Sequence, residues 1–321
     1  MKEKIDIFYS KDWVDYELLD TGEGEKLERV GKYKFIRPYE DAVWARTLSK
    51  KEWSDVNGKF WSSKAGAKSG WKMNKEIEKK WQISYKGINL LVMPTPFRHY
   101  GFFPEQASHW DFIEGIIAQQ NKIFSSCALP GVPGGTLGDK KFHSASPKKR
   151  VKFLNLFGYT GIASLFALRA GAEVTHLDAS KQSLAWAKEN QKISGLENLP
   201  MRVICDDALK FIEREAKRGN RYDCIIMDPP KYGRGPKGEI WKIEDKLPEL
   251  LAGIKKILSA KPLFVILTSY AIDTSSISLG YALEETMKEF SGEVKNGELC
   301  VLEKTNARII PLANTVVWES K

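Results

Sequence analysis

The sequence predicts an α/β protein in which a doubly wound, mostly parallel sheet is joined to a smaller N-terminal β-rich domain. From residue 151 onward, apolar runs of strand length alternate with segments of helical periodicity, which is the pattern of a mostly parallel sheet. Residues 1–100 lack this alternation and show short apolar runs between Gly, Asp and Asn turns, which is typical of short strands. At 321 residues the chain is long enough for two domains, which we place at residues 1–100 and 101–321.

The first unit of the predicted sheet lies between residues 151 and 178. An apolar strand, Val151–Phe157, is followed by a tight turn with Gly158 and Gly161, a helix, and a second strand that stops at Asp178. This order is that of the opening unit of a nucleotide-binding sheet. The glycines would let the backbone approach a ligand closely, and the acid could hold two ribose hydroxyls. An ordinary turn in an α/β sheet is the alternative.

The spacing of the glycines indicates which ligand would bind. A dinucleotide site has the pattern G-x-G-x-x-G because a pyrophosphate lies on the helix N-terminus. Here the bulky Tyr159 stands where a second glycine would be needed. A ligand with a ribose and no phosphate fits better, and S-adenosylmethionine is the common one. A nicotinamide-dependent oxidoreductase is the less favoured alternative.

The alternation of strands and helices continues to the end of the chain. Ser180 is the expected cap of the next helix and Gly195 its end. The remaining elements are expected as strands at Met201–Cys205, Tyr222–Met227 and Leu263–Leu267, helices at Ala208–Lys217, Glu244–Leu258 and Ser276–Phe290, and closing strands near Leu299–Glu303 and Arg308–Trp318. A short polar link joins the two closing strands, so we expect them to be antiparallel.

Acids follow three of these strands at their carboxyl ends, the edge at which an open α/β sheet holds its ligand. Asp178 is expected on the ribose, and Asp206 or Asp207 would accept from the adenine amino group, although either could simply cap a helix. Asp228 opens the sequence Asp-Pro-Pro-Lys, whose prolines remove backbone donors and fix φ. The rigid carbonyls could grip a planar base by its exocyclic amine, and a rigid turn is the alternative.

The N-terminal domain is rich in Trp and Lys. Seven of the ten tryptophans lie at or before Trp110, and ten lysines stand against four acids between Lys50 and Lys86. Basic residues attract phosphates and aromatic faces stack on unpaired bases, so the domain could bind RNA. Equally, the tryptophans could form its core and the lysines its solvated face. The expected strands here are Glu17–Leu19, Lys32–Ile36, Trp81–Tyr85 and Ile88–Met93.

Two connections are expected between these regions. Met93–Asp111 is predicted as a linker, because its prolines keep its start extended, and Ser108 is the expected cap of a helix that begins near His109. Residues 128–150 are rich in Gly, Pro, Ser and Lys, and we predict a mobile loop there.

Composition places the chain among globular proteins. Hydrophobic residues make up 42% and charged residues 28%, and no apolar run reaches the length of a membrane span. The start M-K-E-K-I-D predicts no signal peptide. The four cysteines are far apart, so we expect reduced thiols, a cytoplasmic location and no metal site. A net charge of +9 favours a polyanionic partner.

Five short motifs carry a resemblance to a known family. The chain resembles class I S-adenosylmethionine-dependent methyltransferases, and is most similar to the bacterial 23S ribosomal RNA enzymes that include a cytosine-C5 methyltransferase with a D-P-P-K motif. The resemblance spans about residues 13 to 318 and implies a seven-stranded, Rossmann-like methyltransferase sheet. The motifs are G-F-F-P-E-Q at Gly101–Gln106, N-L-F-G-Y-T-G at Asn155–Gly161, L-D-A-S at Leu177–Ser180, D-D-A at Asp206–Ala208 and D-P-P-K at Asp228–Lys231.

The resemblance also implies a set of site residues and an RNA acceptor, most simply ribosomal RNA. The implied cofactor contacts are Phe103, Gln106, Asn155, Phe157, Gly158, Tyr159, Thr160, Gly161, Asp178, Ala179, Ser180, Asp206, Asp207, Ala208 and Asp228. The implied catalytic residues are Asp228, Pro229, Pro230 and Lys231. Lys231 and Tyr232 are further candidates for contacting the acceptor, or are simply solvated. The oligomeric state is not predicted.

One departure from that family bears on the reaction. Methylation at cytosine C5 needs a thiolate that adds to C6, and the related enzyme carries it in T-C-S-C. The corresponding stretch here, Leu267–Ala271, reads L-T-S-Y-A and has no cysteine. We therefore expect methylation of a base nitrogen, which needs only positioning beside the activated methyl group. A small-molecule or protein methyltransferase on the same fold is the alternative.

Overall fold

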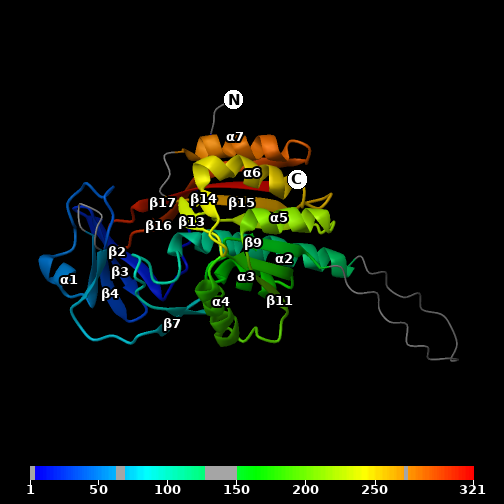
Figure 1. Cartoon of the computed structure of the whole chain (residues 1–321). Helices are drawn as coiled ribbons and strands as arrows, with labels where there is room; N and C mark the ends of the chain where they lie inside the picture. The colour runs from blue at the N-terminus through cyan, green and yellow to red at the C-terminus, as the bar shows by residue number, and fades with distance from the viewer. Residues whose placement is uncertain (1–3, 63–68, 127–149, 271–273) are drawn as a thin grey trace.

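The computed structural model describes residues 4–62, 69–126, 150–270 and 274–321, and shows one large sheet with helices on both faces beside a smaller group of N-terminal strands (Figure 1). The large sheet has eight strands, in the order β1-β16-β17-β15-β12-β9-β10-β11. Its strands are β1 (Ile5–Phe8), β9 (Lys152–Leu156), β10 (Glu173–Asp178), β11 (Met201–Cys205), β12 (Cys224–Met227), β15 (Phe264–Ser269), β16 (Gly292–Leu302) and β17 (Ile309–Ser320).

The order of the strands confirms the predicted doubly wound sheet. Strand β9 lies between β10 and β12, and all three are parallel, so the chain reverses its direction of winding at β9. Strand β17 is antiparallel to both β15 and β16, as the short link between the closing strands predicted. Ligands of such sheets bind beyond the carboxyl ends of the strands, next to the reversal point.

The sheet has one strand more than the seven predicted. Strand β1 pairs in parallel with β16, with Ile5 opposite Asn296 and Phe8 opposite Leu299. Residues 5–8 therefore belong to the large sheet and not to the N-terminal strands. The strand escaped prediction because Ile5 and Ile7 are both more than half exposed, so its apolar alternation marks an edge strand and not a buried one.

Helices cover both faces of the sheet and enclose two apolar cores. On one face lie α2 (Ala107–Ser126), α3 (Ile162–Arg169) and α4 (Lys181–Ile193), and on the other α5 (Ala208–Lys217), α6 (Ile243–Lys255) and α7 (Ser276–Met287) (Figure 1). Alternate residues of each central strand enter opposite cores: Phe153 packs with α2 and α3, whereas Leu154 packs with the other three helices. The predicted linker in fact contains a short 3-10 helix, η1 (Pro104–Gln106), and the start of α2.

The N-terminal strands form two further sheets. One has five strands, β2 (Tyr16–Gly22), β3 (Glu25–Val30), β4 (Tyr33–Pro38), β5 (Gly58–Ser62) and β6 (Ser69–Met73), with the short helix α1 (Lys50–Ser54) beside them. The other is a hairpin of β7 (Trp81–Tyr85) and β8 (Ile88–Val92). The four strands predicted here correspond to β2, β4, β7 and β8, with bounds that differ by up to three residues.

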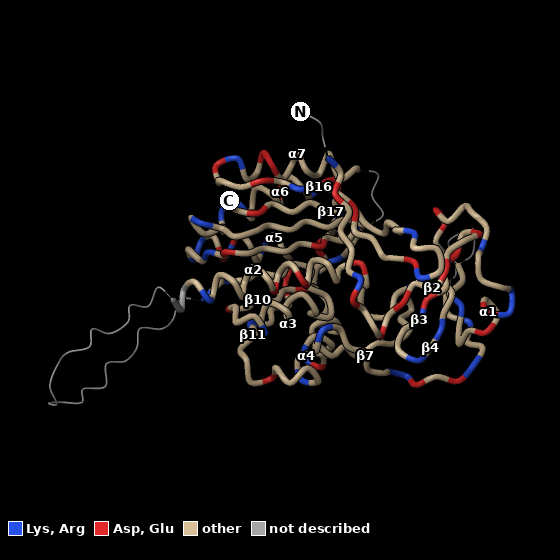
Figure 2. Tube along the Cα trace, turned by 180° about the vertical axis from the view of Figure 1, so that it is seen from behind, with Lys and Arg blue, Asp and Glu red and all other residues tan. Residues whose placement is uncertain are grey.

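Most of the tryptophans between Lys50 and Lys86 are core residues and not an exposed RNA-binding surface. Trp53 and Trp81 are buried, at 3% and 5% exposure, and only Trp61 of the four between Lys50 and Lys86 is well exposed, at 44%. The lysines are partly neutralised by acids, as in the pair of Lys75 with Asp55. Figure 2 shows basic and acidic segments side by side along these strands.

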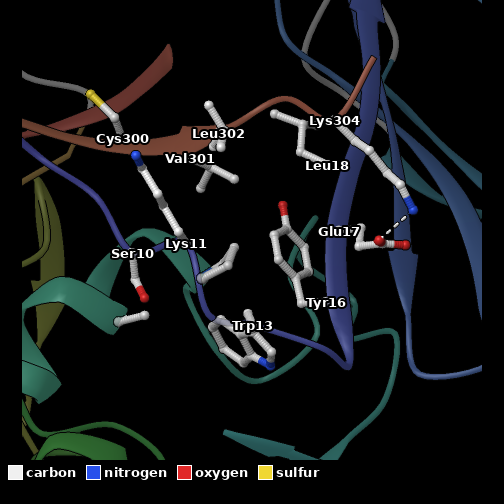
Figure 3. Close-up of a pocket in the computed structure, with 12 residues that line it drawn as sticks. Ser10, Lys11, Trp13, Tyr16, Glu17, Leu18, Cys300, Val301, Leu302 and Lys304 are labelled. Atoms are coloured by element: carbon white, nitrogen blue, oxygen red, sulfur yellow. Dashed lines mark hydrogen bonds and ion pairs between the residues drawn. The ribbon is translucent and has the colours of Figure 1, made fainter. Parts of the chain in front are cut away.

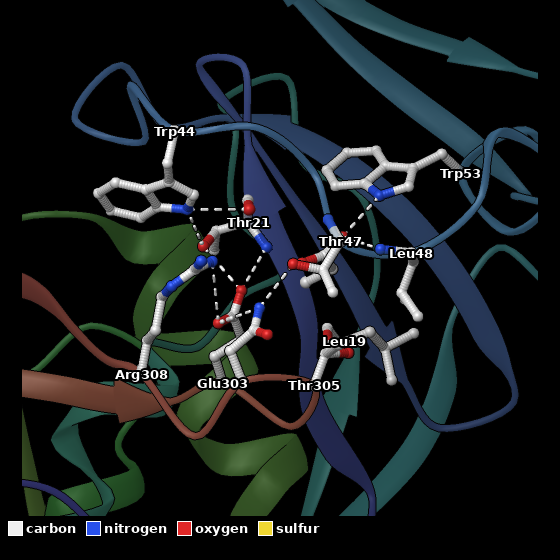
Figure 4. Close-up of polar contacts among 11 residues, drawn as sticks. Leu19, Thr21, Trp44, Thr47, Leu48, Trp53, Glu303, Thr305 and Arg308 are labelled. Atoms are coloured by element: carbon white, nitrogen blue, oxygen red, sulfur yellow. Dashed lines mark hydrogen bonds and ion pairs between the residues drawn. The ribbon is translucent and has the colours of Figure 1, made fainter.

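A polar cluster joins the N-terminal sheet to the turn between β16 and β17 (Figure 4). The carboxylate of Glu303, which is fully buried, accepts hydrogen bonds from the backbone N–H of Thr21 at 2.6 Å and from its hydroxyl at 2.8 Å. The backbone N–H of Lys304 donates to the carbonyl of Leu18. The two parts of the chain are thereby held by buried polar contacts as well as by apolar packing.

Two further expectations concern the predicted loop and the absence of a membrane span. The loop predicted at residues 128–150 lies outside the described residues, except for Arg150. Within the described parts of the chain, no helix combines the length and apolar character needed to cross a membrane.

Candidate active site

A cleft of about 860 Å³ lies beyond the carboxyl ends of the central strands. The residues that directly end or follow β9, β10, β12 and β15 all line it, namely Phe157, Asp178, Asp228 and Tyr270. This is the edge at which the sheet topology places a ligand. The structure thus brings together Asp178 and Asp228, two of the three acids predicted at strand ends, whereas neither Asp206 nor Asp207 lines the cleft.

The N-terminal sheet forms the opposite wall of the cleft. Lys26 on β3 and Arg37 on β4 line it, and both side chains are otherwise enclosed by protein. Arg37 donates to the buried carboxylate of Glu28 at 2.5 and 2.7 Å. Burial opposes ionisation of that carboxyl, but Arg37 and Lys26 outweigh burial and lower its pKa to about 2. The cleft therefore has a rigid, charged wall that the sequence did not reveal, because strands more than 100 residues apart build it.

The glycine turn lies where it was predicted, and close packing accounts for both of its glycines. A Cβ atom on Gly158 would come within 2.3 Å of the ring of His176, and one on Gly161 within 2.8 Å of Ala187 Cβ. Gly161 also has a φ of +85°, in the region that favours glycine. Close packing of the turn on the sheet and on α4 thus already requires the glycines. Approach of a ligand to their backbone stays a prediction.

The residues that face the cleft from this turn are the two that flank Gly158. Phe157 and Tyr159 have φ angles of +60° and +50°, an uncommon and strained conformation for aromatic residues. Both line the cleft. The turn therefore directs two aromatic side chains toward the ligand space while the glycine between them packs inward.

Asp178 holds the turn in this conformation. Its Oδ2 accepts from the backbone N–H of Tyr159 at 2.8 Å, and its Oδ1 accepts from that of Ser180 at 2.8 Å. Burial raises the pKa of the Asp178 carboxyl, and the two N–H donors oppose that rise. Ala179 and Ser180 continue along the cleft, and Ser180 caps α4 as predicted.

Asp228 lies on the cleft floor within a polar group. The amide nitrogen of Gln106 donates to Asp228 Oδ2 and to the hydroxyl of Tyr270, both at 3.2 Å. Burial, and next the charge of Glu105, raise the pKa of Asp228 well above its ordinary value. The Oε1 of Gln106 and the hydroxyl of Ser269 are buried without a hydrogen-bond partner. A bound ligand with polar groups would satisfy such atoms.

An aromatic group lines the cleft between these two acids. The ring of Phe103 lies 5.1 Å from Tyr270, 5.3 Å from His99 and 6.0 Å from Tyr159. Burial, followed by the charges of Arg37 and Arg98, lowers the pKa of His99 to about 4, so its imidazole is neutral at pH 7. An apolar aromatic wall with few polar groups is typical of a small-ligand site.

Several predicted site residues do not line the cleft and support it from behind. Asn155 donates to Ser164, Thr160 donates to the carbonyl of Gly101, and Ala208 is buried in α5. Asp207 caps α5 by accepting from the N–H of Lys210, which is the helix-cap alternative. Asp206 forms an ion pair with Arg214.

Sequence reasoning missed Glu105, His99 and Tyr270 as lining residues. Glu105 and His99 lie in and beside the G-F-F-P-E-Q segment, and Tyr270 is the residue that stands in the thiol-bearing stretch. Both segments were singled out in the sequence, but no local pattern shows that the two meet.

None of the described cysteines lines the cleft. Cys224 is buried in β12, and burial raises its thiol pKa well above the ordinary value. Cys205 is exposed at the end of β11. Cys300 lines a separate cavity of about 170 Å³ beside Trp13 and Tyr16 (Figure 3). Burial, followed by Glu298, raises its pKa to about 12.

Comparison with known sequences and structures gives the following relatives. A family model described as conserved hypothetical protein 95 matches residues 140–250. The ribosomal RNA large subunit methyltransferase K of Neisseria meningitidis serogroup B is 30% identical over 155 residues, which are 47% of this chain and 43% of that protein. The chain thus spans less than half the length of the curated relatives it matches.

Solved structures extend the likeness to nearly the whole chain. A crystal structure of the SAM-dependent methyltransferase from Agrobacterium tumefaciens is 38% identical, covers 98% of this chain and 94% of its own, and has a TM-score of 0.85. A putative SAM-dependent methyltransferase from Streptococcus mutans is 15% identical, with 96% and 76% coverage and a TM-score of 0.65, and supports the fold alone.

The cofactor predicted from the glycine spacing is therefore confirmed as S-adenosylmethionine, and the nicotinamide alternative is excluded. This match covers both the doubly wound sheet and the N-terminal strands that close the cleft. The chain belongs to the class I S-adenosylmethionine-dependent methyltransferases.

Proposed function

We propose that this enzyme methylates RNA, with ribosomal RNA as its natural acceptor, and that it does so at a base nitrogen. The curated relatives are named for methylation of large-subunit ribosomal RNA, and the net charge of +9 suits a polyanionic acceptor. The observation that carries the choice of a base nitrogen is the carboxyl group of Asp228 on the floor of a cleft that no described cysteine lines.

The residues around the cleft fit the cofactor. Asp178 offers a carboxylate to the ribose hydroxyls, and the aromatic side chains of Phe103, Phe157 and Tyr159 offer faces to an adenine ring. The unpartnered hydroxyl of Ser269, which lines the cleft, is available to a polar group of the ligand, and the unpartnered Oε1 of Gln106 belongs to a side chain that contacts the lining residue Asp228. We assign these residues to cofactor binding, and Asn155, Thr160 and Gly161 to support of the turn.

The cofactor supplies a methyl group that is already electrophilic, so the protein has to position the acceptor and receive one proton. Pro229 and Pro230 line the cleft beside Asp228 and hold a stiff rim for a planar base. An exocyclic amine that gains a methyl group must lose a proton, and the Asp228 carboxylate is placed to accept the amine N–H and then that proton. A raised carboxyl pKa makes Asp228 a stronger base.

A thiol-dependent reaction at cytosine C5 finds no support in the same cleft. Tyr270 belongs to the stretch that corresponds to the thiol-bearing one of the related enzyme, and its hydroxyl accepts a hydrogen bond from Gln106. The N-terminal sheet, which contributes Lys26 and Arg37 to the opposite wall, is proposed to hold the RNA strand as a separate acceptor domain.

The proposal is tested by incubating the enzyme and labelled S-adenosylmethionine with ribosomal RNA from a strain that lacks it, and then analysing the nucleosides by mass spectrometry. We expect one additional N-methylated nucleoside, absent with Asp228→Asn. A 5-methylcytidine product would overturn the choice of atom, and transfer to no RNA would overturn the choice of acceptor.

A further inference from the structure

A small hairpin directly after the Asp-Pro-Pro-Lys sequence was not predicted. Its strands are β13 (Tyr232–Arg234) and β14 (Ile240–Lys242), and their register places Tyr232 opposite Lys242 and Arg234 opposite Ile240. Because side chains alternate between the faces of a strand, these four residues share one face. All four are exposed.

The other face of the hairpin attaches it to the active site. Trp241 is buried, its indole N–H donates to the carbonyl of Pro230 at 2.7 Å, and its ring lies 4.9 Å from that of Phe157. Gly233, opposite Trp241, leaves room for Pro230, since a Cβ atom there would lie 3.2 Å from the proline ring. The position of the hairpin is thus fixed by the same prolines that form the cleft rim.

The exposed face has the chemistry of a nucleic-acid surface. Residues 231–242 carry four Lys or Arg and one acid, Glu239, and Glu239 is paired with Lys210 on α5 at 2.6 Å. Within the described residues, no ion pair is formed by Lys231, Arg234 or Lys242. Tyr232 is 53% exposed and Ile240 59%.

A second segment at the cleft repeats this combination. Arg98 lines the cleft, and the neighbouring Phe97 is 69% exposed. The ring of Phe97 stacks on that of His99 at 5.8 Å, and the Arg98 carbonyl accepts from Arg37 at 2.6 Å. Two segments that contribute to the cleft lining therefore present an exposed aromatic ring beside a cation.

We propose that the exposed hairpin face, Tyr232, Arg234, Ile240 and Lys242, binds the unpaired nucleotides next to the methylated base. This inference rests on the proposed RNA function and names the form of RNA recognised. A base can enter the cleft only after leaving its stack. Tyr232 would then stack on a neighbouring unpaired base, while Arg234 and Lys242 would contact phosphates.

The test uses a fluorescently labelled single-stranded RNA of about 16 nucleotides, near the upper site size of single-strand binding folds, and the same RNA as a duplex. We expect Tyr232→Leu to weaken single-strand binding about tenfold. Arg234→Ala should lower the slope of log affinity against log salt by about 0.7, the value for one phosphate contact. Single strand should be preferred to duplex.

Lys261→Ala is the matched control. Lys261 is an exposed lysine just before β15, at the amino edge of the sheet and away from the cleft, and its loss should change neither affinity nor slope. All variants should bind S-adenosylhomocysteine as the wild type does, which confirms that they fold. Wild-type affinity in both hairpin variants, or equal binding of duplex, overturns this inference alone. Failure of the wild type to bind either RNA overturns the proposed function as well.

Discussion

The backbone N–H of Tyr159 donates to the carboxylate of Asp178 at 2.8 Å. This bond couples the turn after β9 to the acid at the end of β10, although 19 residues separate them. It helps hold Tyr159 at a positive φ. The acid that we propose for the ribose therefore also shapes a turn that lines the cleft.

Asp178→Ala should weaken the binding of S-adenosylhomocysteine by at least about 100-fold. Each hydrogen bond to a charged group contributes about 1.5–3 kcal/mol. The substitution would remove both hydrogen bonds that the ribose hydroxyls donate to Asp178. Titration calorimetry measures the change, and unchanged affinity would remove Asp178 from the site. Asp207→Ala is the control: it should lower stability by about 1 kcal/mol through loss of a helix cap, and leave cofactor affinity as it was.

Gly158→Ala should abolish cofactor binding and lower the melting temperature, because the added methyl group would meet the ring of His176 at 2.3 Å. The double variant Gly158→Ala, His176→Ala should recover part of both, since the obstacle is removed. If the double variant binds no better than the single one, the glycine is needed for approach of the ligand and the steric explanation fails.

Local sequence patterns were sufficient for the central strands of the catalytic sheet, for physical reasons that particular elements show. Strand β11 and helix α5 have the predicted bounds, because apolar periodicity, the acid before α5 and the Arg-Gly-Asn turn after it all agree. Asp178 and Asp228 line one cleft because parallel strands place their carboxyl ends at one edge.

The remainder could not be predicted because it depends on contacts between distant segments. Strand β1 is exposed and pairs only at the edge of the sheet, with β16 at the far end of the chain. The cleft wall formed by Lys26 and Arg37 comes from the N-terminal sheet, and neither residue was singled out in the sequence. Gly158 was recognised from the sequence, but the steric reason for it was not. A Cβ atom at this position would clash with the ring of His176 on the next strand.

Asp228→Asn should abolish methyl transfer, leave cofactor binding measurable, and stabilise the protein at neutral pH. The folded pKa of Asp228 is raised, by burial first and by Glu105 next, so ionisation opposes folding. Its contribution to stability is complete below the unfolded pKa near 4 and is lost as pH rises through the folded pKa. Thermal melts of the unliganded protein should therefore differ most at pH 7–8 and converge near pH 4.

The raised pKa of Asp228 also predicts how the methyl-transfer rate depends on pH. If Asp228 receives the proton, the wild-type rate should rise with pH through its raised pKa. A rate independent of pH from 5 to 9, or full turnover by Asp228→Asn, would contradict the assigned role. Glu293→Gln, an exposed carboxylate on β16, is a suitable control and should leave both the melts and the rate unchanged.

Replacement of all four cysteines by Ala should leave methyl transfer within about threefold of wild type, because no described thiol lines the cleft and N-methylation forms no thioether. Cys224→Ala should cost about 1 kcal/mol of stability, as loss of a small buried side chain does. Rates are compared at saturating cofactor. Loss of transfer with intact cofactor binding would point to a thiol-dependent reaction.

Glu303→Ala should lower the free energy of unfolding by about 2–4 kcal/mol. The substitution leaves the buried N–H and hydroxyl of Thr21 without their acceptor, and each unsatisfied group costs about 1–3 kcal/mol. Urea titration measures the loss. Glu293→Ala on β16, whose partner Lys295 is exposed, should cost less than about 1 kcal/mol. Because Glu303 fixes the sheet that carries Arg37, the Glu303 variant should also weaken RNA binding more than cofactor binding. Equal losses of RNA affinity and cofactor affinity would show that the N-terminal sheet has no specific role in binding the RNA acceptor.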